Sequence, residues 1–304
     1  MLNIPVINLN DSGIKATFTI NQDVVRLSAS HPMNVEWLAV LREIAPHDHD
    51  YYEVSFVRRG KARHQTEGGR QTLGPGSVVV VPPGGVHAFA QTQGMEVINL
   101  YYLAEWIAAG WRGQWAERGL VPLFLAQVLF RQESSARPSI LQLNAREAAA
   151  IEFELEEIRD ELKRVNPSQL LLKASLLKVL VRLSRASDTS HEEFPEMVWS
   201  VIEEIELCVD NGRMFDLHAL MRRWPITPDH GSRMFRRATG LSPQEYYQRR
   251  RIQRACALLL DVSNAATRVA AELGFADAAH FSRLFRRHMG MGPRDYRRKY
   301  AVQR

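Results

Sequence analysis

The 304-residue sequence has few cysteines, no leader-like start and no long hydrophobic run. Its two cysteines, Cys208 and Cys256, are too few for a disulfide scaffold or a four-cysteine zinc site, and they are typical of a reducing compartment. The first ten residues lack the basic and apolar regions of a signal peptide. The longest apolar-rich run, 120–130, contains Pro122 and Gln127 and is too short for a membrane span, so a buried helix is expected there. These absences predict a cytoplasmic protein.

Enzyme signatures are missing as well. No Walker, Rossmann or nucleophile-elbow motif occurs where a strand and a helix would support it. With 45% hydrophobic and 24% charged residues, the composition is that of an ordinary globular protein that is too long for one typical domain.

The net charge of +5 is unevenly distributed. Residues 212–304 contain 19 Lys and Arg against 7 Asp and Glu, whereas residues 1–211 contain 20 against 27. A basic module joined to an acidic one is typical of nucleic-acid binding, although a solvated basic surface gives the same balance.

Residues 14–103 have the pattern of short strands. Apolar residues alternate from Ile14 to Ile20, and the β-branched run 78–81 is bounded by Gly76 and a proline. Paired glycines mark further turns, so this region is predicted to be an all-β sandwich or barrel.

Helical periodicity replaces this pattern over 104–195. The apolar face of 170–181 is wide enough for a dimer contact as well as core packing, and 184–195 is predicted to be an exposed linker. Helices are expected to continue from 196 to 304.

The basic region contains an internal repeat at an offset of 50 residues. SRMFRR at 232–237 matches SRLFRR at 282–287, and the following Gly, Pro and Tyr match too. Each copy has the layout of a helix-turn-helix, with Gly274 ending one helix and Asp277 capping the next. The segment 242–261 between the copies would form a rod of about 30 Å, close to one turn of B-DNA.

This repeat resembles the DNA-binding domain of the AraC/XylS family of bacterial transcription regulators. The resemblance is carried by RVAAELGF at 268–275, DAAHFSRLF at 277–285 and GMGP at 290–293, with weaker matches in the first copy. It implies a multidomain α+β protein: an effector-binding domain at 14–103, a helical connector or dimerisation region at 104–195, and an all-α tandem helix-turn-helix domain at 196–304. It also implies contact with RNA polymerase.

The alignment with the family predicts the residues that contact double-stranded DNA. Those expected to read base edges are Asp229, His230, Ser232, Arg233, Ala278, Ala279, His280, Ser282 and Arg283. Those expected to neutralise phosphates are Arg236, Arg237, Arg286 and Arg287. Asp229 would either accept a hydrogen bond from cytosine or cap its helix, whereas Phe235 and Phe285 are expected in the core.

The first copy departs from the family pattern more than the second. Gly231 stands where a large apolar residue is usual, Met221 replaces a small alanine, and Pro225 lies in the turn. In the second copy, Ala266 replaces a β-branched residue and Gly292 a Ser or Thr. The changes in the first copy predict that it is less stable than the second, or that it reads DNA bases differently.

The acidic half carries a second constellation, His47, His49 and Glu53, followed by His87 after a Pro-Gly turn. If 47–53 is one strand, the first three side chains share a face, which in a small barrel is the interior. Three imidazoles and a carboxylate suit a divalent transition metal such as Zn, Fe, Ni or Mn. Without metal, these groups and Tyr51, on the same face, would bind sugar hydroxyls. His64 lies off this pattern.

The spacing matches both motifs of the cupin superfamily, His-x-His-x3-Glu-x6-Gly and Gly-x5-Pro-x-Gly-x2-His, with Gln91 in place of the trailing Asn. The resemblance implies a cupin or jelly-roll barrel, similar to the sensor domain of the rhamnose-responsive subgroup of the AraC family. Its implied small-molecule ligand is sugar-like.

The favoured hypothesis is therefore a ligand-responsive DNA-binding regulator, an activator working as a homodimer, and not an enzyme. One alternative is a metal-dependent cupin dioxygenase or isomerase with a DNA-binding tail. Another is a regulator whose barrel only dimerises.

Overall fold

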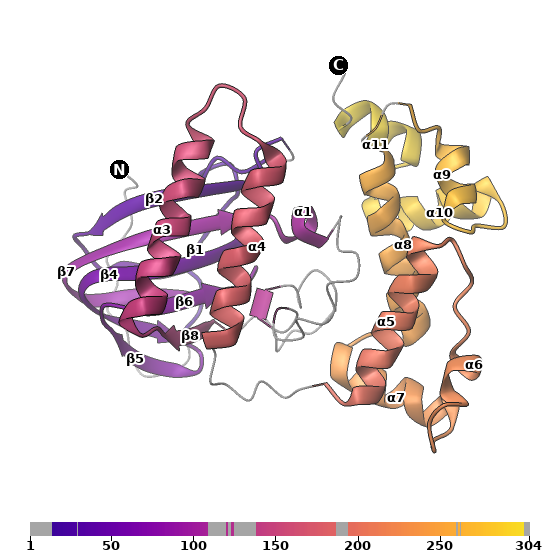
Figure 1. Ribbon diagram of the computed structural model, residues 1–304, viewed down its shortest axis with the longest axis horizontal. Coiled ribbons are helices and arrows are strands. Elements are labelled where there is room, and N and C mark those ends of the chain that lie inside the picture. Colours follow the sequence, from indigo (N-terminus) through magenta and orange to yellow (C-terminus); the bar gives the residue numbers. More distant parts are fainter. Residues whose placement is uncertain are drawn as a thin grey trace. The chain divides into compact units, whose positions relative to one another are not determined.

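The computed structural model describes residues 14–28, 30–108, 120, 123–124, 138–186, 194–259, 261 and 263–300. Residues 14–107 and 138–186 belong to one compact unit, and 194–300 belong to a second (Figure 1). The predicted fold class is confirmed: a cupin-like β-domain with helices, and an all-α tandem helix-turn-helix. The predicted domain limits near 103 and 195 stay a prediction. Every helix within the described ranges is too short or too polar to span a bilayer.

The first unit is built on an eight-stranded sheet. Its strands are β1 (Phe18–Ile20), β2 (Met33–Val40), β3 (Ile44–His49), β4 (Tyr52–Thr66), β5 (Gly69–Leu73), β6 (Ser77–Val81), β7 (His87–Tyr102) and β8 (Ser139–Gln142). The path β1-β3-β7-β4-β6-β8 is extended by β2 on β7 and β5 on β4. The long strand β7 pairs with β4 along one edge and with β3 and β2 along the other, so the cupin motif residues of three strands meet around it.

Strand β8 lies in a region for which the sequence predicted helices. Its residues pair antiparallel with the β-branched strand β6, and Leu141 is buried. A four-residue strand is too short for periodicity to reveal, and the partner edge is what stabilises it. Of the 120–130 run, Leu120, Leu123 and Phe124 are buried, and its other residues lie outside the described ranges.

Helices α1 (Ala104–Ala108), α3 (Ala145–Leu162) and α4 (Gln169–Ala186) complete the first unit, and α3 and α4 form an antiparallel hairpin (Figure 1). Asn144 and Glu147 form a capping box at the start of α3. Arg159 stacks on the outward Trp37 ring of β2 at 4.2 Å from its centroid. Of the wide apolar face predicted for α4, one part is buried in the unit and Leu170 and Leu171 stay exposed. The start of the predicted linker, 184–186, belongs to α4, and 187–193 lie outside the described ranges.

The second unit consists of seven described helices: α5 (Glu196–Asp210), α6 (Leu217–Met221), α7 (Pro228–Thr239), α8 (Pro243–Leu259), α9 (Ala266–Glu272), α10 (Ala278–Met289) and α11 (Pro293–Tyr300). Helices α6 and α7 form the first helix-turn-helix copy, and α9 and α10 form the second. Both α7 and α10 begin at a side-chain cap and end at a glycine in the left-handed conformation. The predicted caps Asp277 and Gly274 are confirmed. The connecting helix α8 has 17 residues rather than the 20 expected.

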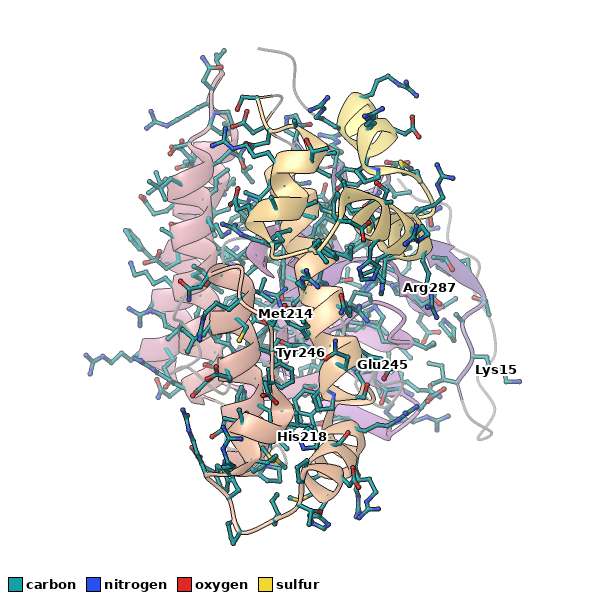
Figure 2. All side chains as sticks on the ribbon, turned by 90° about the vertical axis from the view of Figure 1, so that its right-hand side faces the viewer. Lys15, Met214, His218, Glu245, Tyr246 and Arg287 are labelled. Carbon is teal, nitrogen blue, oxygen red and sulfur yellow. The ribbon has the colours of Figure 1, made fainter. Side chains whose placement is uncertain are left out.

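A buried ion pair holds α5 against α8. The Arg250 guanidinium donates to both carboxylate oxygens of Glu206 at 2.6 and 2.9 Å, and the Tyr246 hydroxyl donates to the same carboxylate at 2.9 Å. Figure 2 shows Tyr246 inside the helical unit, in contrast to the outward Arg287. Because every charge in this network has a partner, burial of these groups is tolerated.

The second copy is joined to α5 by a close backbone contact. A Cβ placed on Gly212 would lie 2.3 Å from the Glu272 carbonyl oxygen, and one on Gly274 would lie 2.3 Å from the Gly212 oxygen. Both glycines have positive φ. Arg251 of α8 adds a hydrogen bond to the Leu273 carbonyl at 3.0 Å. The turn of the second copy is therefore fastened to the segment that follows α5 and to the connecting helix α8.

Candidate effector site and DNA interface

The cupin motif residues gather at one place inside the first unit, although His47, His49 and Glu53 do not share the single strand considered for them. His47 and His49 end β3, the chain turns at Asp50 and Tyr51, and Glu53 lies on β4. His87 begins β7 directly opposite His47 in the strand register. All four side chains are buried, so the turn brings together what a single strand would have spread out.

Glu53 occupies the centre of this cluster. Its Oε1 accepts hydrogen bonds from the Ser55 hydroxyl and the Asn99 amide, each at 2.8 Å. Its Oε2 lies 3.3 Å from His49 Nε2 and 3.9 Å from His87 Nε2. One carboxylate oxygen is thus fixed by the protein, and the other faces the imidazoles.

The imidazoles are oriented by their Nδ1 atoms. His47 Nδ1 donates to the Ala45 carbonyl at 3.0 Å and His49 Nδ1 to the Tyr51 carbonyl at 2.7 Å. His87 Nδ1 lies 3.3 Å from His64 Nε2. This pattern leaves the Nε2 atoms for other partners: that of His49 faces Glu53 Oε2, and that of His87 is buried with no hydrogen bond among the described residues. Such orientation through the second nitrogen is characteristic of metal-ligating histidines.

Burial controls the protonation of the cluster. It lowers the pKa of His47 and His87, and it lowers the pKa of His64 to about 4, so these imidazoles are neutral at pH 7. Burial alone would raise the pKa of Glu53, but the hydrogen bond and charge of His49 outweigh it and the net shift is downward. Neutral imidazoles beside an ionised carboxylate are the state in which a metal is bound.

Three of the four predicted ligands are close enough to share an ion. One ligand atom each from His47, Glu53 and His87 lies within 4.8 Å of the others. His49 contacts Glu53 but is outside this triad. The arrangement can hold a small cation or present hydrogen-bonding atoms to a polar ligand.

Aromatic rings enclose the cluster. The Tyr51 ring stacks on His49 with centroids 4.5 Å apart, and it is itself buried against Tyr101. Phe18 of β1 stacks on His47 at 5.4 Å. The Tyr51 ring is therefore part of the wall, in contact with the predicted site residues.

Sequence reasoning missed three residues of this site. His64, set aside as lying off the motif, contacts His87, while Ser55 and Asn99 fix Glu53. Ser55 could have been found, because it is two residues from Glu53 on the same strand and so faces the same side. His64 and Asn99 reach the site only through the register of β4 against β7, which the sequence does not display.

The predicted DNA-contacting residues form exposed surfaces on α7 and α10. Of the thirteen, only Ser232 is half-buried, and the other twelve are exposed. Phe235 and Phe285 are fully buried, as predicted. Thr227 caps α7 by accepting from the His230 backbone N–H at 3.3 Å, so the capping role considered for Asp229 is wrong, and Asp229 is exposed.

Two departures of the first copy compensate each other. A Cβ on Gly231 would lie 2.5 Å from Met221 Sδ, which means that the Met221 side chain fills the space a larger residue at 231 would occupy. Both residues are buried. The first copy therefore keeps a packed core without a large side chain from its recognition helix.

Comparison with known families identifies the chain. Residues 36–193 match the AraC-like ligand binding domain, and residues 220–299 match a helix-turn-helix domain. The chain belongs to the AraC family of transcription regulators. It is a ligand-responsive, DNA-binding regulator rather than an enzyme, as the sequence predicted.

Similar proteins extend over most of the chain. RhaS of Yersinia pestis strain Pestoides F, named an HTH-type transcriptional activator, is 26% identical over 84% of this chain and 89% of its own length. RhaR of Mannheimia succiniciproducens, also named an activator, is 20% identical over 84% and 87%. These similarities support the predicted resemblance to the rhamnose-responsive subgroup. Among solved structures, ToxT from Vibrio cholerae O395 is 13% identical and covers 89% of this chain and 98% of its own, with a TM-score of 0.38.

Proposed function

We propose that this chain activates transcription by placing α7 and α10 in successive major grooves of a double-stranded operator, in response to a small polar effector bound in the barrel. The observation that carries the proposal is the twice-repeated exposed basic face, with the phenylalanines of the same helices turned inward. Arg233 and Arg283 occupy equivalent places and would each make a bidentate contact to guanine. Arg236, Arg237, Arg286 and Arg287 would neutralise phosphates.

The test begins by selecting the preferred operator from random DNA with the purified full chain. Arg233→Ala and Arg283→Ala are then measured by fluorescence anisotropy on that operator and on unrelated DNA. Each is expected to cost about 1–3 kcal/mol on the operator, with relaxed preference at one half of the site. Equal losses on both DNAs would contradict base reading by these arginines.

For the barrel, we propose that His47, Glu53 and His87 hold a divalent transition metal and that His49 and Tyr51 contact the effector. The residues fit the ion, because the unpartnered Nε2 atom of His87, a ring nitrogen of His47 and the Glu53 carboxylate converge, and the Nδ1 atoms of both histidines already have partners. A bound ion would supply a Lewis-acidic anchor for effector hydroxyl or carboxylate groups.

Metal content of the purified chain and of a His47→Ala/His87→Ala variant tests this assignment. Mass spectrometry is expected to find about one equivalent in the first and none in the second, and a chelator should lower the melting temperature of the first only. A metal-free wild-type chain that still binds a sugar would assign the same side chains to direct hydrogen bonding.

We further propose that the chain forms a homodimer and contacts RNA polymerase. Leu170 and Leu171 at the start of α4 are exposed apolar side chains that suit a contact with a second copy. Sedimentation of Leu170→Glu/Leu171→Glu tests the dimer, which should dissociate. Transcription in vitro with purified polymerase, with and without the chain, tests activation.

A further inference from the structure

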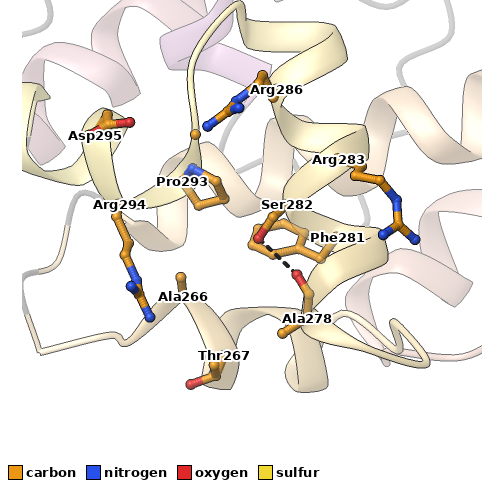
Figure 3. A pocket seen from close by; sticks show the side chains of 11 residues that line it. Ala266, Thr267, Ala278, Phe281, Ser282, Arg283, Arg286, Pro293, Arg294 and Asp295 are labelled. Atoms are coloured by element: carbon orange, nitrogen blue, oxygen red, sulfur yellow. Dashed lines mark hydrogen bonds between the residues drawn. The ribbon is translucent and has the colours of Figure 1, made fainter.

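The second helix-turn-helix copy contains a hollow of about 420 Å³ beside its recognition helix. Side chains from the starts of α9 and α11 and from α10 line it, as Figure 3 shows. Ala278, Ser282 and Arg283, which were predicted to read DNA bases, form one of its sides. The hollow therefore opens on the surface that the proposed function directs toward DNA.

Basic side chains outnumber acidic ones in the lining. Arg283, Arg286 and Arg294 are exposed, and none of them makes an ion pair within the described part of the chain. The lining carboxylate, Asp295, is already paired with Arg298 at 2.8 Å. In Figure 3, Arg294 extends beside Thr267 and Arg286 extends toward Pro293, while Arg283 points away. An anion beside Thr267 could thus meet the Arg294 guanidinium and a hydroxyl, with Arg286 on the other side of Pro293.

The start of α11 lacks the cap that its counterpart has. In the first copy the Ser242 hydroxyl caps α8 by accepting from the Glu245 N–H at 3.2 Å. In the second copy the equivalent residue is Gly292, which has no side chain, and a Cβ there would lie 3.4 Å from Asp295 Oδ2 and 3.5 Å from Arg286 Nη2. The start of α11 therefore lacks the side-chain cap that Ser242 gives to α8, and because Pro293 has no N–H, only the N–H groups after it can meet an anion.

The equivalent place in the first copy has different chemistry. At the offset of 50 residues, Thr267 and Arg294 correspond to Leu217 and Gln244. Ala266 corresponds to Asp216, whose carboxylate caps α6. The first copy thus has two arginines against two carboxylates, whereas the second has three arginines against one. An anion site is built in one copy only.

We propose that this hollow binds one phosphate group of the DNA backbone, held by Arg294 and the Thr267 hydroxyl at the start of α11, with Arg286 adding positive charge to the same hollow. The proposal rests on the proposed function, because the phosphate comes from the same duplex. It adds Arg294 and Thr267 to the interface, and it makes the second copy the stronger backbone anchor.

The experiment uses the full chain with Arg294→Gln and Thr267→Leu, which install the residues of the first copy. Arg42→Gln in the first unit is the control for net charge. Binding to the selected operator and to unrelated DNA is measured over a salt series. For Arg294→Gln, affinity is expected to fall about threefold or more on both DNAs, with the slope of log affinity against log salt shallower by about 0.9. The control should leave the slope unchanged.

Neutral methylphosphonate, placed at one backbone position at a time, identifies the source of the phosphate. One position should weaken the wild-type chain and have no further effect on Arg294→Gln. Two outcomes would show that the hollow is not a DNA-phosphate site, provided that the wild type binds its operator specifically. Either Arg294→Gln keeps the full salt slope, or each methylphosphonate position weakens the wild type and the variant equally. The proposed function would stand in both cases. Saturable binding of inorganic phosphate to the DNA-free chain, without this coupling, would likewise overturn the assignment. A wild-type chain without operator preference would instead refute the proposed function.

Discussion

The two units of this regulator place their chemistry differently. In the barrel, four imidazoles are buried around the Glu53 carboxylate, whereas in the DNA-binding unit the arginines of α7 and α10 are exposed to solvent. Buried titratable groups couple a site to the stability of its domain, while exposed charges act on a partner with little effect on folding. The barrel is suited to sense a small molecule, and the basic faces are suited to bind a polyanion.

A second comparison lies between the two helix-turn-helix copies. Their recognition helices have equal length and the same kind of ends, but the residues beneath and beside them differ. The first copy uses Met221 to fill the space at Gly231, and the second uses Phe281 at the equivalent position. The second copy is also fastened to the segment that follows α5, through Gly212 and Gly274. The same helix-turn-helix backbone thus accommodates two different core packings, and the exposed basic face of the recognition helix is kept in both copies.

The largest effect is expected at the contact between glycines. Gly274→Ala adds a Cβ 2.3 Å from the Gly212 carbonyl oxygen at positive φ, so the free energy of unfolding of the second unit should fall by about 3 kcal/mol or more. Gly290→Ala is the matched control, because its φ is similar but nothing lies within 4 Å, and about 1 kcal/mol is expected. Hydrogen exchange of α9–α11 peptides in a urea series measures both. Equal losses would show that the contact with α5 contributes nothing.

The barrel should lose stability in acid. The pKa of His64 falls from an ordinary 6.5 to about 4 on folding, so the unfolded chain binds more protons between these values and stability decreases as pH falls through this window. For His64 alone the loss approaches about 3 kcal/mol. Hydrogen exchange of barrel peptides in metal-free chain, from pH 7 to pH 4, measures it. His64→Gln should flatten the profile, and a wild-type profile as flat as that of the variant would contradict the burial argument.

A double-mutant cycle sharpens the comparison of the copies. Met221→Ala leaves a void and Gly231→Phe overfills the space, and each alone should cost about 2 kcal/mol. Together they install the pair found in the second copy, Ala271 and Phe281, and should cost about 2 kcal/mol less than the sum. Hydrogen exchange of α6–α7 peptides gives the four values. Strict additivity would mean that the two residues do not share one space.

The smallest effects concern the starts of α8 and α11. Ser242→Ala removes a cap and should destabilise the second unit by about 1 kcal/mol. Gly292→Ser adds a cap and should stabilise the unit by about 0.3 kcal/mol. Thermal unfolding compares the two variants. If Gly292→Ser is neutral and Ser242→Ala costs nothing, capping does not distinguish the copies.

Patterns that repeat along the chain predicted much of this structure. The offset of 50 residues located both recognition helices, and the inward phenylalanines followed from helical spacing. The cupin spacing located His47, His49, Glu53 and His87, although the turn at Asp50 placed them on three strands. In each case the sequence pattern that made the prediction was either short or repeated at a regular spacing.

Contacts set by tertiary register could not be predicted in this way. His64 reaches His87 only because β4 pairs with β7, and β8 forms only because the edge of β6 is available. In the sequence, Met221 and Gly231 are two unrelated departures from the family pattern. Only the structure shows that the Met221 side chain fills the space beside Gly231. The missing cap at Gly292 gained meaning only beside the arginines of the hollow.

The most direct test is a hydroxyl-radical footprint of the full chain on its selected operator. The structure predicts two protected patches on one face of the duplex, separated by about one helical turn, with Arg233→Ala and Arg283→Ala each weakening one patch. A single protected patch unaffected by either substitution, or no protection at saturating protein, would contradict the reading of DNA by both copies.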